Sequence, residues 1–140
     1  MPIKQVITLD TEFVSSRDGQ QPFQIAMRSY RLEGNQLILM SDFNVFVQLK
    51  QGLKLTYYAK KVSGITNEKL QEYGIYPTEA IHQIIYYLLA LDVDSTLLVG
   101  WDPINDRRML DVLLNDQESL INIDRFRWFD LVVPYKALLT

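Results

Sequence analysis

V-I-T-L-D-T-E-F-V, residues 6–14, is the stretch that decides the fold of this chain. Its β-branched and apolar residues are typical of a buried strand. Asp10 and Glu12 are two positions apart, so on a strand both side chains leave the same face, about 7 Å apart. A divalent cation between them would remove the repulsion of two like charges beside an apolar strand. An isolated Asp-x-Glu is also common where a strand runs out into solvent, so other residues must decide between these interpretations.

Length and composition indicate one globular domain that spans residues 1–140. A chain of this size buries roughly two thirds of its unfolded surface. Hydrophobic residues make up 48% and charged residues 22%, which argues against disorder. Because there is no cysteine, disulfides and thiolate metal sites are excluded, and a metal would be held by oxygen or by the single histidine, His82. Oxygen ligands favour Mg²⁺ or Mn²⁺.

The net charge of -3 and the pI near 5.1 argue against binding of duplex DNA through overall charge. Nucleic acid would have to bind at a local site. The N-terminus has no apolar signal core, and the longest apolar run, residues 84–91, is too short to span a bilayer. We therefore expect a cytoplasmic protein without a membrane partner.

The first third of the chain predicts three antiparallel strands. Ser, Asp, Gly and Pro in residues 15–22 favour a turn after the first strand. Residues 23–32 and 36–47 are rich in strand formers, and Glu33-Gly34-Asn35 between them is typical of a hairpin turn.

The middle of the chain predicts helices. Residues 55–62 favour a short helix that stops at Ser63-Gly64, and a second short helix is capped by Thr66 and ended by Gly74. Pro77-Thr78 opens a longer helix with one apolar stripe. The residues of that stripe are Ile81, Ile84, Ile85, Leu88 and Leu89.

The last third alternates strand and helix. Residues 96–101 form a compact apolar run that predicts a buried parallel strand, reached by a helical crossover. Asp102-Pro103 then predicts a helix start, with Pro103 at the first helical position and Asp106 in the second turn. A short strand up to Phe129 and a final helix after Asp130, interrupted by Pro134, complete a mixed sheet packed with helices.

Asp106 is a third carboxylate that the fold could bring to the first strand. It follows a central strand, so it would reach Asp10 and Glu12 if the two strands are neighbours. The alternative role is a favourable interaction with its own helix N-terminus, worth about 0.3–1 kcal/mol.

Three motifs in this order resemble the DEDD 3′-to-5′ exonucleases of the ribonuclease H-like fold. They are L-D-T-E-F (9–13), K-K-V-S-G-I-T-N-E-K-L (60–70) and L-V-G-W-D-P-I-N-D-R-R-M-L (98–110). F-N-V-F-V (43–47) and R-W-F-D-L-V-V-P-Y (127–135) are similar to the branch of the histone messenger RNA 3′-end exonuclease and its bacterial relatives. The resemblance implies an α/β fold in which a mixed sheet, three antiparallel strands then parallel ones, carries helices on both faces and is shortened at the C-terminus.

The resemblance also implies roles for individual residues at a 3′ end of single-stranded RNA or DNA. Asp10 would bridge two Mg²⁺ or Mn²⁺ ions, Glu12 would bind the first ion and Asp106 would help to hold the second. Thr11 and Phe13 match positions that lie against the terminal nucleotide, and Trp101 would support the second motif. Plain packing is the alternative for these three residues.

Basic residues could contact phosphates, or could simply form a solvated surface. Arg107 and Arg108 flank Asp106, and lysines cluster between the third strand and the long helix. These lysines are Lys50, Lys54, Lys60, Lys61 and Lys69.

The third family motif, a His or Tyr followed by a fourth Asp, is missing. His82 precedes Asp106 and is expected to be structural or exposed, while Asp130 is expected to cap the last helix. A 3′-to-5′ exonuclease with impaired activity is therefore expected. The alternatives are a catalytically inactive module that binds nucleic acid or protein, and a homodimer or partner chain that completes the site.

Overall fold

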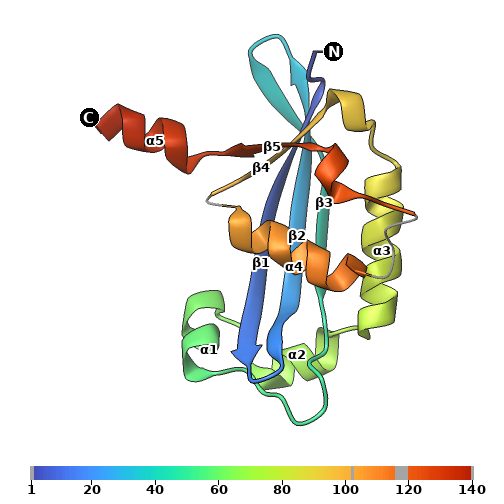
Figure 1. Cartoon of the computed structure of the whole chain (residues 1–140), viewed down its shortest axis with the longest axis vertical. Coiled ribbons are helices and arrows are strands. Elements are labelled where there is room, and N and C mark those ends of the chain that lie inside the picture. Colours follow the sequence, from blue (N-terminus) through green and yellow to red (C-terminus); the bar gives the residue numbers. More distant parts are fainter. Residues whose placement is uncertain (1, 102, 116–119, 140) are drawn as a thin grey trace.

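The computed structural model describes residues 2–101, 103–115 and 120–139 and contains one five-stranded mixed sheet (Figure 1). The strand order is β3-β2-β1-β4-β5. The strands are β1 (Gln5–Ser16), β2 (Gly19–Glu33), β3 (Gln36–Phe46), β4 (Thr96–Gly100) and β5 (Arg127–Asp130). The helices are α1 (Tyr57–Ser63), α2 (Asn67–Tyr73), α3 (Pro77–Leu89), α4 (Ile104–Leu114) and α5 (Val132–Leu139).

The three antiparallel strands at the start are confirmed, but the first turn is much shorter than expected. β1 and β2 pair as far as Ser16 and Gly19, so residues 15–22 are mostly strand. Gly19 has a φ of 115°, which lets the chain reverse tightly. The backbone hydrogen bonds between β1 and β2 outweigh the preference of the polar residues 15–22 for a turn. The hairpin at residues 33–35 is confirmed, with Gly34 at a φ of 58°.

β4 is parallel to β1, as expected, and is much shorter than β1. The two strands pair from Gln5 with Thr96 to Thr8 with Val99. β1 continues for eight residues beyond Thr8, to Ser16, while β4 ends at Gly100. The segment of β1 that carries Asp10 and Glu12 therefore extends past its parallel neighbour.

The two long helices, α3 and α4, both pack on one face of the sheet. Their buried side chains share one core with residues of all three first strands. This core contains Ile7, Leu9, Ile25, Met27, Val45, Ile84, Ile85, Leu88, Leu98, Leu110, Leu114, Ile123 and Phe126. Leu89, expected in the apolar stripe of α3, is instead 56% exposed.

A second, smaller core closes the far end of β1. Val14 and Phe23 pack there against residues of α1, α2 and the loops around them. The predicted caps are confirmed, since Thr56 and Thr66 accept hydrogen bonds at the starts of α1 and α2. Gly64 ends α1 at a φ of 72°.

The start of α4 differs by one residue from the prediction. Pro103 occupies the N-cap position and the helix begins at Ile104, which places Asp106 in the first turn rather than the second. The predicted cap by Asp102 lies outside the described residues.

Pro134 does not interrupt α5, contrary to the prediction. It lies in the first turn, where a backbone N–H would have no partner within the helix. Asp130 caps this helix, as expected, because its carboxylate accepts from the backbone N–H of Val132 at 2.9 Å. Among the described residues, no helix is long and apolar enough to cross a membrane.

The packing predicts different outcomes for two leucines on neighbouring helices. Leu110→Ala is expected to lower the free energy of unfolding by about 2–5 kcal/mol, because Leu110 is fully buried in the main core. Leu89→Ala is the matched control and should stay within about 0.5 kcal/mol. Urea denaturation measures both, and equal losses would contradict this packing.

Candidate functional site

The N-terminus of α4 brings Asp106 to Thr11 of β1, the residue that separates the two acidic residues of the first motif in the sequence. Oδ1 of Asp106 accepts the backbone N–H of Thr11 at 3.0 Å and the Thr11 hydroxyl at 2.5 Å. Thr11 lies between Asp10 and Glu12 in the strand. The prediction that Asp106 reaches the first strand is therefore confirmed, and the short β4 leaves this stretch of β1 accessible to it.

Asp10 and Asp106 act electrostatically on Glu12. The pKa of Glu12 is raised above its ordinary value of 4.5, first by burial and then by the negative charges of Asp10 and Asp106. Each of these causes disfavours the ionised form of Glu12. A cation at this place would relieve the repulsion.

A cavity of about 360 Å³ lies beside Glu12, between the end of β1 and α1. Glu12 and Phe13 line it from the strand, and Tyr58 and Val62 line it from α1. Tyr58 is 75% exposed, so its aromatic ring is available to a ligand. The sequence analysis missed Tyr58 and Val62, although apolar residues on a short helix that packs only through Ala59 were a signal.

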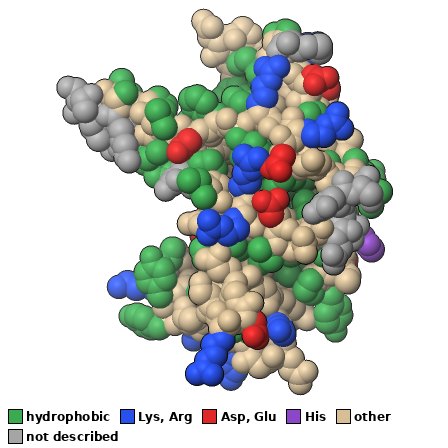
Figure 2. Space-filling model, in the orientation of Figure 1, with side chains coloured by type: hydrophobic (Ala, Val, Ile, Leu, Met, Phe, Trp, Pro, Cys, Tyr) green, Lys and Arg blue, Asp and Glu red, His purple; other side chains and the backbone are tan. Residues whose placement is uncertain are grey.

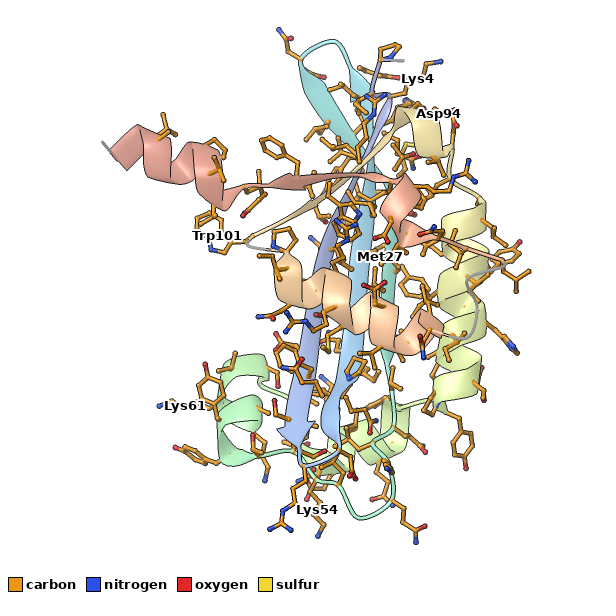
Figure 3. The ribbon with its side chains drawn as sticks, in the orientation of Figure 1. Lys4, Met27, Lys54, Lys61, Asp94 and Trp101 are labelled. Atoms are coloured by element: carbon orange, nitrogen blue, oxygen red, sulfur yellow. The ribbon has the colours of Figure 1, made fainter. Side chains whose placement is uncertain are left out.

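Asp10 lies on the open face of the sheet, in an adjacent hollow of about 360 Å³. Arg28 and Asp42 line the same hollow, 3.6 Å apart as an exposed ion pair. Figure 2 shows the surface indented between α1 and α5, on the side where Figure 3 labels Trp101.

The other predicted site residues have different surroundings. Thr11 is buried and holds Asp106, a contact that the sequence analysis did not foresee. Trp101 is exposed at the end of β4. Arg107 turns to the C-terminal segment, where its guanidinium pairs with Asp124 and lies 5.1 Å from the centre of the Trp128 ring.

His82, Lys50 and Lys69 have other surroundings. His82 is exposed on α3, as expected. Lys50 forms an exposed ion pair with Asp18 at 3.6 Å, and the Lys69 ammonium lies 5.4 Å from the centre of the Phe46 ring.

The residues fit a divalent cation by their chemistry rather than by a preformed cage. Carboxylate oxygens are the ligands that Mg²⁺ and Mn²⁺ prefer, and the raised pKa of Glu12 reflects its burial first and then the negative charges of Asp10 and Asp106. Within the described ranges, no three acidic or histidine side chains are close enough together to hold a metal ion. Asp130, the last acid of the described chain, caps α5.

Comparison with known proteins identifies structures but no sequence relatives. No protein-family model and no curated protein matches this chain. The structure of E. coli exonuclease I in complex with a dT13 oligonucleotide matches with a TM-score of 0.76 at 13% identity, over 97% of this chain and 30% of its own. The zinc-ion-bound form of an E. coli exonuclease I–ssDNA complex matches with a TM-score of 0.77 at 13% identity, over 98% of this chain and 30% of its own.

A moderately thermophilic exonuclease I from Methylocaldum szegediense matches with a TM-score of 0.72 at 18% identity, over 93% of this chain and 28% of its own. This chain thus spans less than a third of the length of the protein chain in each of these three structures. At such identities the likeness concerns the fold. The chain has the mixed, ribonuclease H-like sheet of the exonuclease I structures.

Proposed function

We propose that this domain binds the 3′ end of single-stranded nucleic acid and hydrolyses its terminal phosphodiester bond slowly, with the help of divalent cations. The observation that carries the proposal is the contact between Asp106 and Thr11, 95 positions apart in the chain, which brings a third carboxylate to the stretch of β1 that carries Asp10 and Glu12. Asp10, Glu12 and Asp106 would hold Mg²⁺ or Mn²⁺, two ions at full occupancy. Bound cations of this kind activate a water and stabilise the leaving oxygen.

The chain's own residues orient the substrate and keep the carboxylates in place. Thr11 fixes the Asp106 carboxylate against β1. Phe13 and Tyr58 border the cavity beside Glu12, where a terminal base would stack on an aromatic ring. Such stacking contributes about 1–3 kcal/mol per base and tolerates any sequence.

Two lines of support point to different substrates. The motif resemblance to the branch of the histone messenger RNA 3′-end exonuclease favours RNA. The structural neighbours include exonuclease I bound to single-stranded DNA. We propose a 3′ end of either kind, since the stacking surface does not read the sugar.

Binding without cleavage is the second candidate function. It is favoured by the lack of a three-acid cluster among the described residues and by the use of Asp130 as a helix cap. Without a general base, the rate is expected to fall by about 10²–10⁴.

Metal binding and cleavage can be measured with one variant. Mg²⁺ or Mn²⁺ at about 100 times its Kd is expected to stabilise the protein by about 2.7 kcal/mol. Asp10→Asn should abolish this stabilisation in a thermal melt, whereas the exposed Glu72→Gln on α2 should not.

Cleavage is followed under single-turnover conditions with 5′-labelled RNA and DNA oligonucleotides. Slow Mn²⁺-dependent shortening from the 3′ end, lost in Asp10→Asn, is expected for the exonuclease. Binding with no shortening would favour the second candidate function. Rapid multiple turnover would contradict the impaired activity.

Thr11→Val tests how Asp106 is held. The variant loses a hydroxyl that donates to a charged group, and we expect a loss of about 1.5 kcal/mol, the low end for such bonds because Asp106 is half-buried. Thr11→Ser keeps the hydroxyl and should lose much less. A Thr11→Val variant that is as stable in urea denaturation as the wild type would contradict a stabilising role of this hydroxyl.

Glu12→Gln tests the electrostatic repulsion. Because the pKa of Glu12 is raised in the folded state, protonation favours folding, and this stabilisation is lost as the pH rises through the folded-state pKa. Without divalent cations, Glu12→Gln should therefore raise the Tm at about pH 7, and the gain should vanish near pH 4. Glu72→Gln is the control, and a gain independent of pH would contradict the interpretation.

A further inference from the structure

The segment between β3 and α3 carries a charge opposite to that of the rest of the chain. This segment, residues 48–76, is called the helical lobe below. It contains five lysines and two glutamates, a net charge of +3, whereas the rest of the chain has a net charge of -6. Its helices, α1 and α2, lie at the end of the molecule where β1 ends (Figure 1), and Figure 2 shows Lys and Arg side chains at that end. Such a separation of charge favours a local site for an anionic partner.

Three lysines of the helical lobe are available to an anion. The other two already have partners, a carboxylate and an aromatic ring. Within the described ranges, Lys54, Lys60 and Lys61 form no ion pair, and all three are exposed. Lys60 and Lys61 lie in the last turn of α1, where a positive charge also stabilises the helix. Lys54 precedes α1 and has no such role, so it reports on ligand binding alone.

Exposed tyrosines accompany these lysines. Four of the eight tyrosines of the chain lie in the helical lobe, and each is at least 59% exposed. They are Tyr57, Tyr58, Tyr73 and Tyr76. Cations together with exposed aromatic rings are typical of surfaces that bind single-stranded nucleic acid, because phosphates meet the cations and bases stack on the rings. An acidic peptide would use the cations but not the rings.

A hollow of about 520 Å³ in the helical lobe brings one cation and one ring together. Lys54 and Tyr76 both line it, and Tyr76 is 69% exposed. The exposed Gln71 lines it as well. The hollow therefore offers an ammonium for a phosphate, a ring for a base and an amide for the polar edge of that base.

This hollow is next to the cavity beside Glu12. Thr56 lines that cavity and Lys54 lines the hollow, so only Leu55 separates the two linings along the chain. Two residues of backbone span at most about 7 Å. Leu55 is 5% exposed and packs in the smaller core, which fixes the two openings relative to each other. A strand whose 3′ end lies beside Glu12 can therefore reach the hollow.

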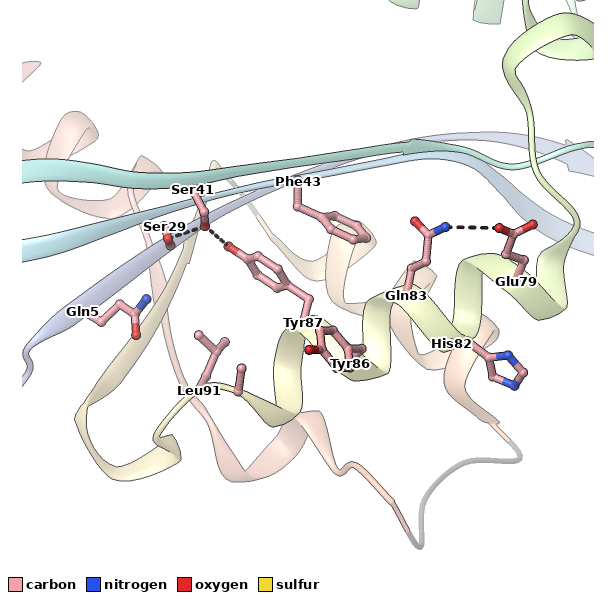
Figure 4. A pocket seen from close by; sticks show the side chains of 11 residues that line it. Gln5, Ser29, Ser41, Phe43, Glu79, His82, Gln83, Tyr86, Tyr87 and Leu91 are labelled. Carbon is pink, nitrogen blue, oxygen red and sulfur yellow. Dashed lines mark hydrogen bonds between the residues drawn. The ribbon is translucent and has the colours of Figure 1, made fainter.

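Another cavity, of about 710 Å³ between α3 and the sheet, has rings without cations (Figure 4). Phe43, Tyr86 and Tyr87 line it, and Tyr86 is 83% exposed. Among the described residues of its lining there is no Lys or Arg. Aromatic exposure alone therefore does not mark the helical lobe, and Tyr86 provides a matched control for Tyr76.

We propose that the helical lobe binds the part of a single-stranded nucleic acid that lies upstream of its 3′ end. A phosphate lies at Lys54 and the neighbouring base stacks on Tyr76, while Lys60 and Lys61 bind further phosphates. The inference rests on the proposed function only for the position of the 3′ end beside Glu12. It makes the substrate a strand of several nucleotides, because a mononucleotide beside Glu12 would leave the helical lobe empty.

Binding is measured by fluorescence anisotropy with a 5′-labelled single strand of about 12 nucleotides, RNA or DNA. The protein is the whole chain with Asp10→Asn and no divalent cation is added, so binding is separated from cleavage. The logarithm of the association constant should fall linearly with the logarithm of the salt concentration. Lys54→Gln should reduce the size of this slope by about 0.7, the value for one phosphate contact on a single strand. Lys4→Gln, an exposed lysine at the opposite end of the molecule (Figure 3), is the control and should change neither slope nor affinity.

Tyr76→Leu tests the stacking in the same assay. Loss of one stacked base should weaken binding by about 5- to 150-fold and leave the salt slope unchanged, because no charge is removed. Tyr86→Leu should bind like the parent protein. In single-turnover cleavage by the chain with native Asp10, Lys54→Gln and Tyr76→Leu should raise the protein concentration needed for half of the maximal rate and leave that maximal rate unchanged.

Several results would overturn the inference. They are Lys54→Gln that behaves like Lys4→Gln, Tyr76→Leu that behaves like Tyr86→Leu, and the absence of binding at low salt. Polyglutamate that competes as well as an unlabelled strand of equal charge would also overturn it, in favour of an acidic polypeptide. The proposed function fails separately. Binding that depends on Lys54 and Tyr76, in a chain that shortens no strand, would support the helical lobe as a binding surface and contradict the exonuclease.

Discussion

The hydrogen bonds from Thr11 to the Asp106 carboxylate are the constraint on which the candidate site depends. They join a strand near the start of the chain to a helix that begins about a hundred residues later. Both donors belong to Thr11, one from its backbone and one from its side chain. Together they fix the position of the Asp106 carboxylate relative to β1. Without this contact, α4 would still pack through Leu110 and Leu114, but the third carboxylate would have no defined place beside Asp10 and Glu12.

The unequal lengths of two neighbouring strands make this contact possible. β1 pairs with β4 only as far as Thr8, and the backbone beyond that point is accessible from the side. In a continuous sheet the Thr11 N–H would donate a hydrogen bond to a neighbouring strand. Here it donates to the Asp106 carboxylate. The early end of a buried strand thus leaves a backbone group of β1 available to the Asp106 carboxylate.

Much of this arrangement follows from local sequence signals, and the rest depends on tertiary packing. Gly64, Thr66 and Pro77 act through their own backbone or cap chemistry, so their positions could be predicted. The apolar stripe of α3 shows that one side is buried but does not say which face of the sheet it meets, nor that Leu89 extends past that sheet. Arg107 follows Asp106 directly, about 100° further round the helix. It therefore meets Trp128 and Asp124, which no local pattern reveals.

The separation of Thr11 and Asp106 has a consequence for the order of folding. The β1–β2–β3 meander is made of local pairings and can form as soon as its own residues leave the ribosome. The parallel pairing with β4 must wait for a large loop to close, which makes it slow. The carboxylates therefore come together last. A chain caught before that step would have most of its antiparallel sheet but no contact between Asp106 and Thr11.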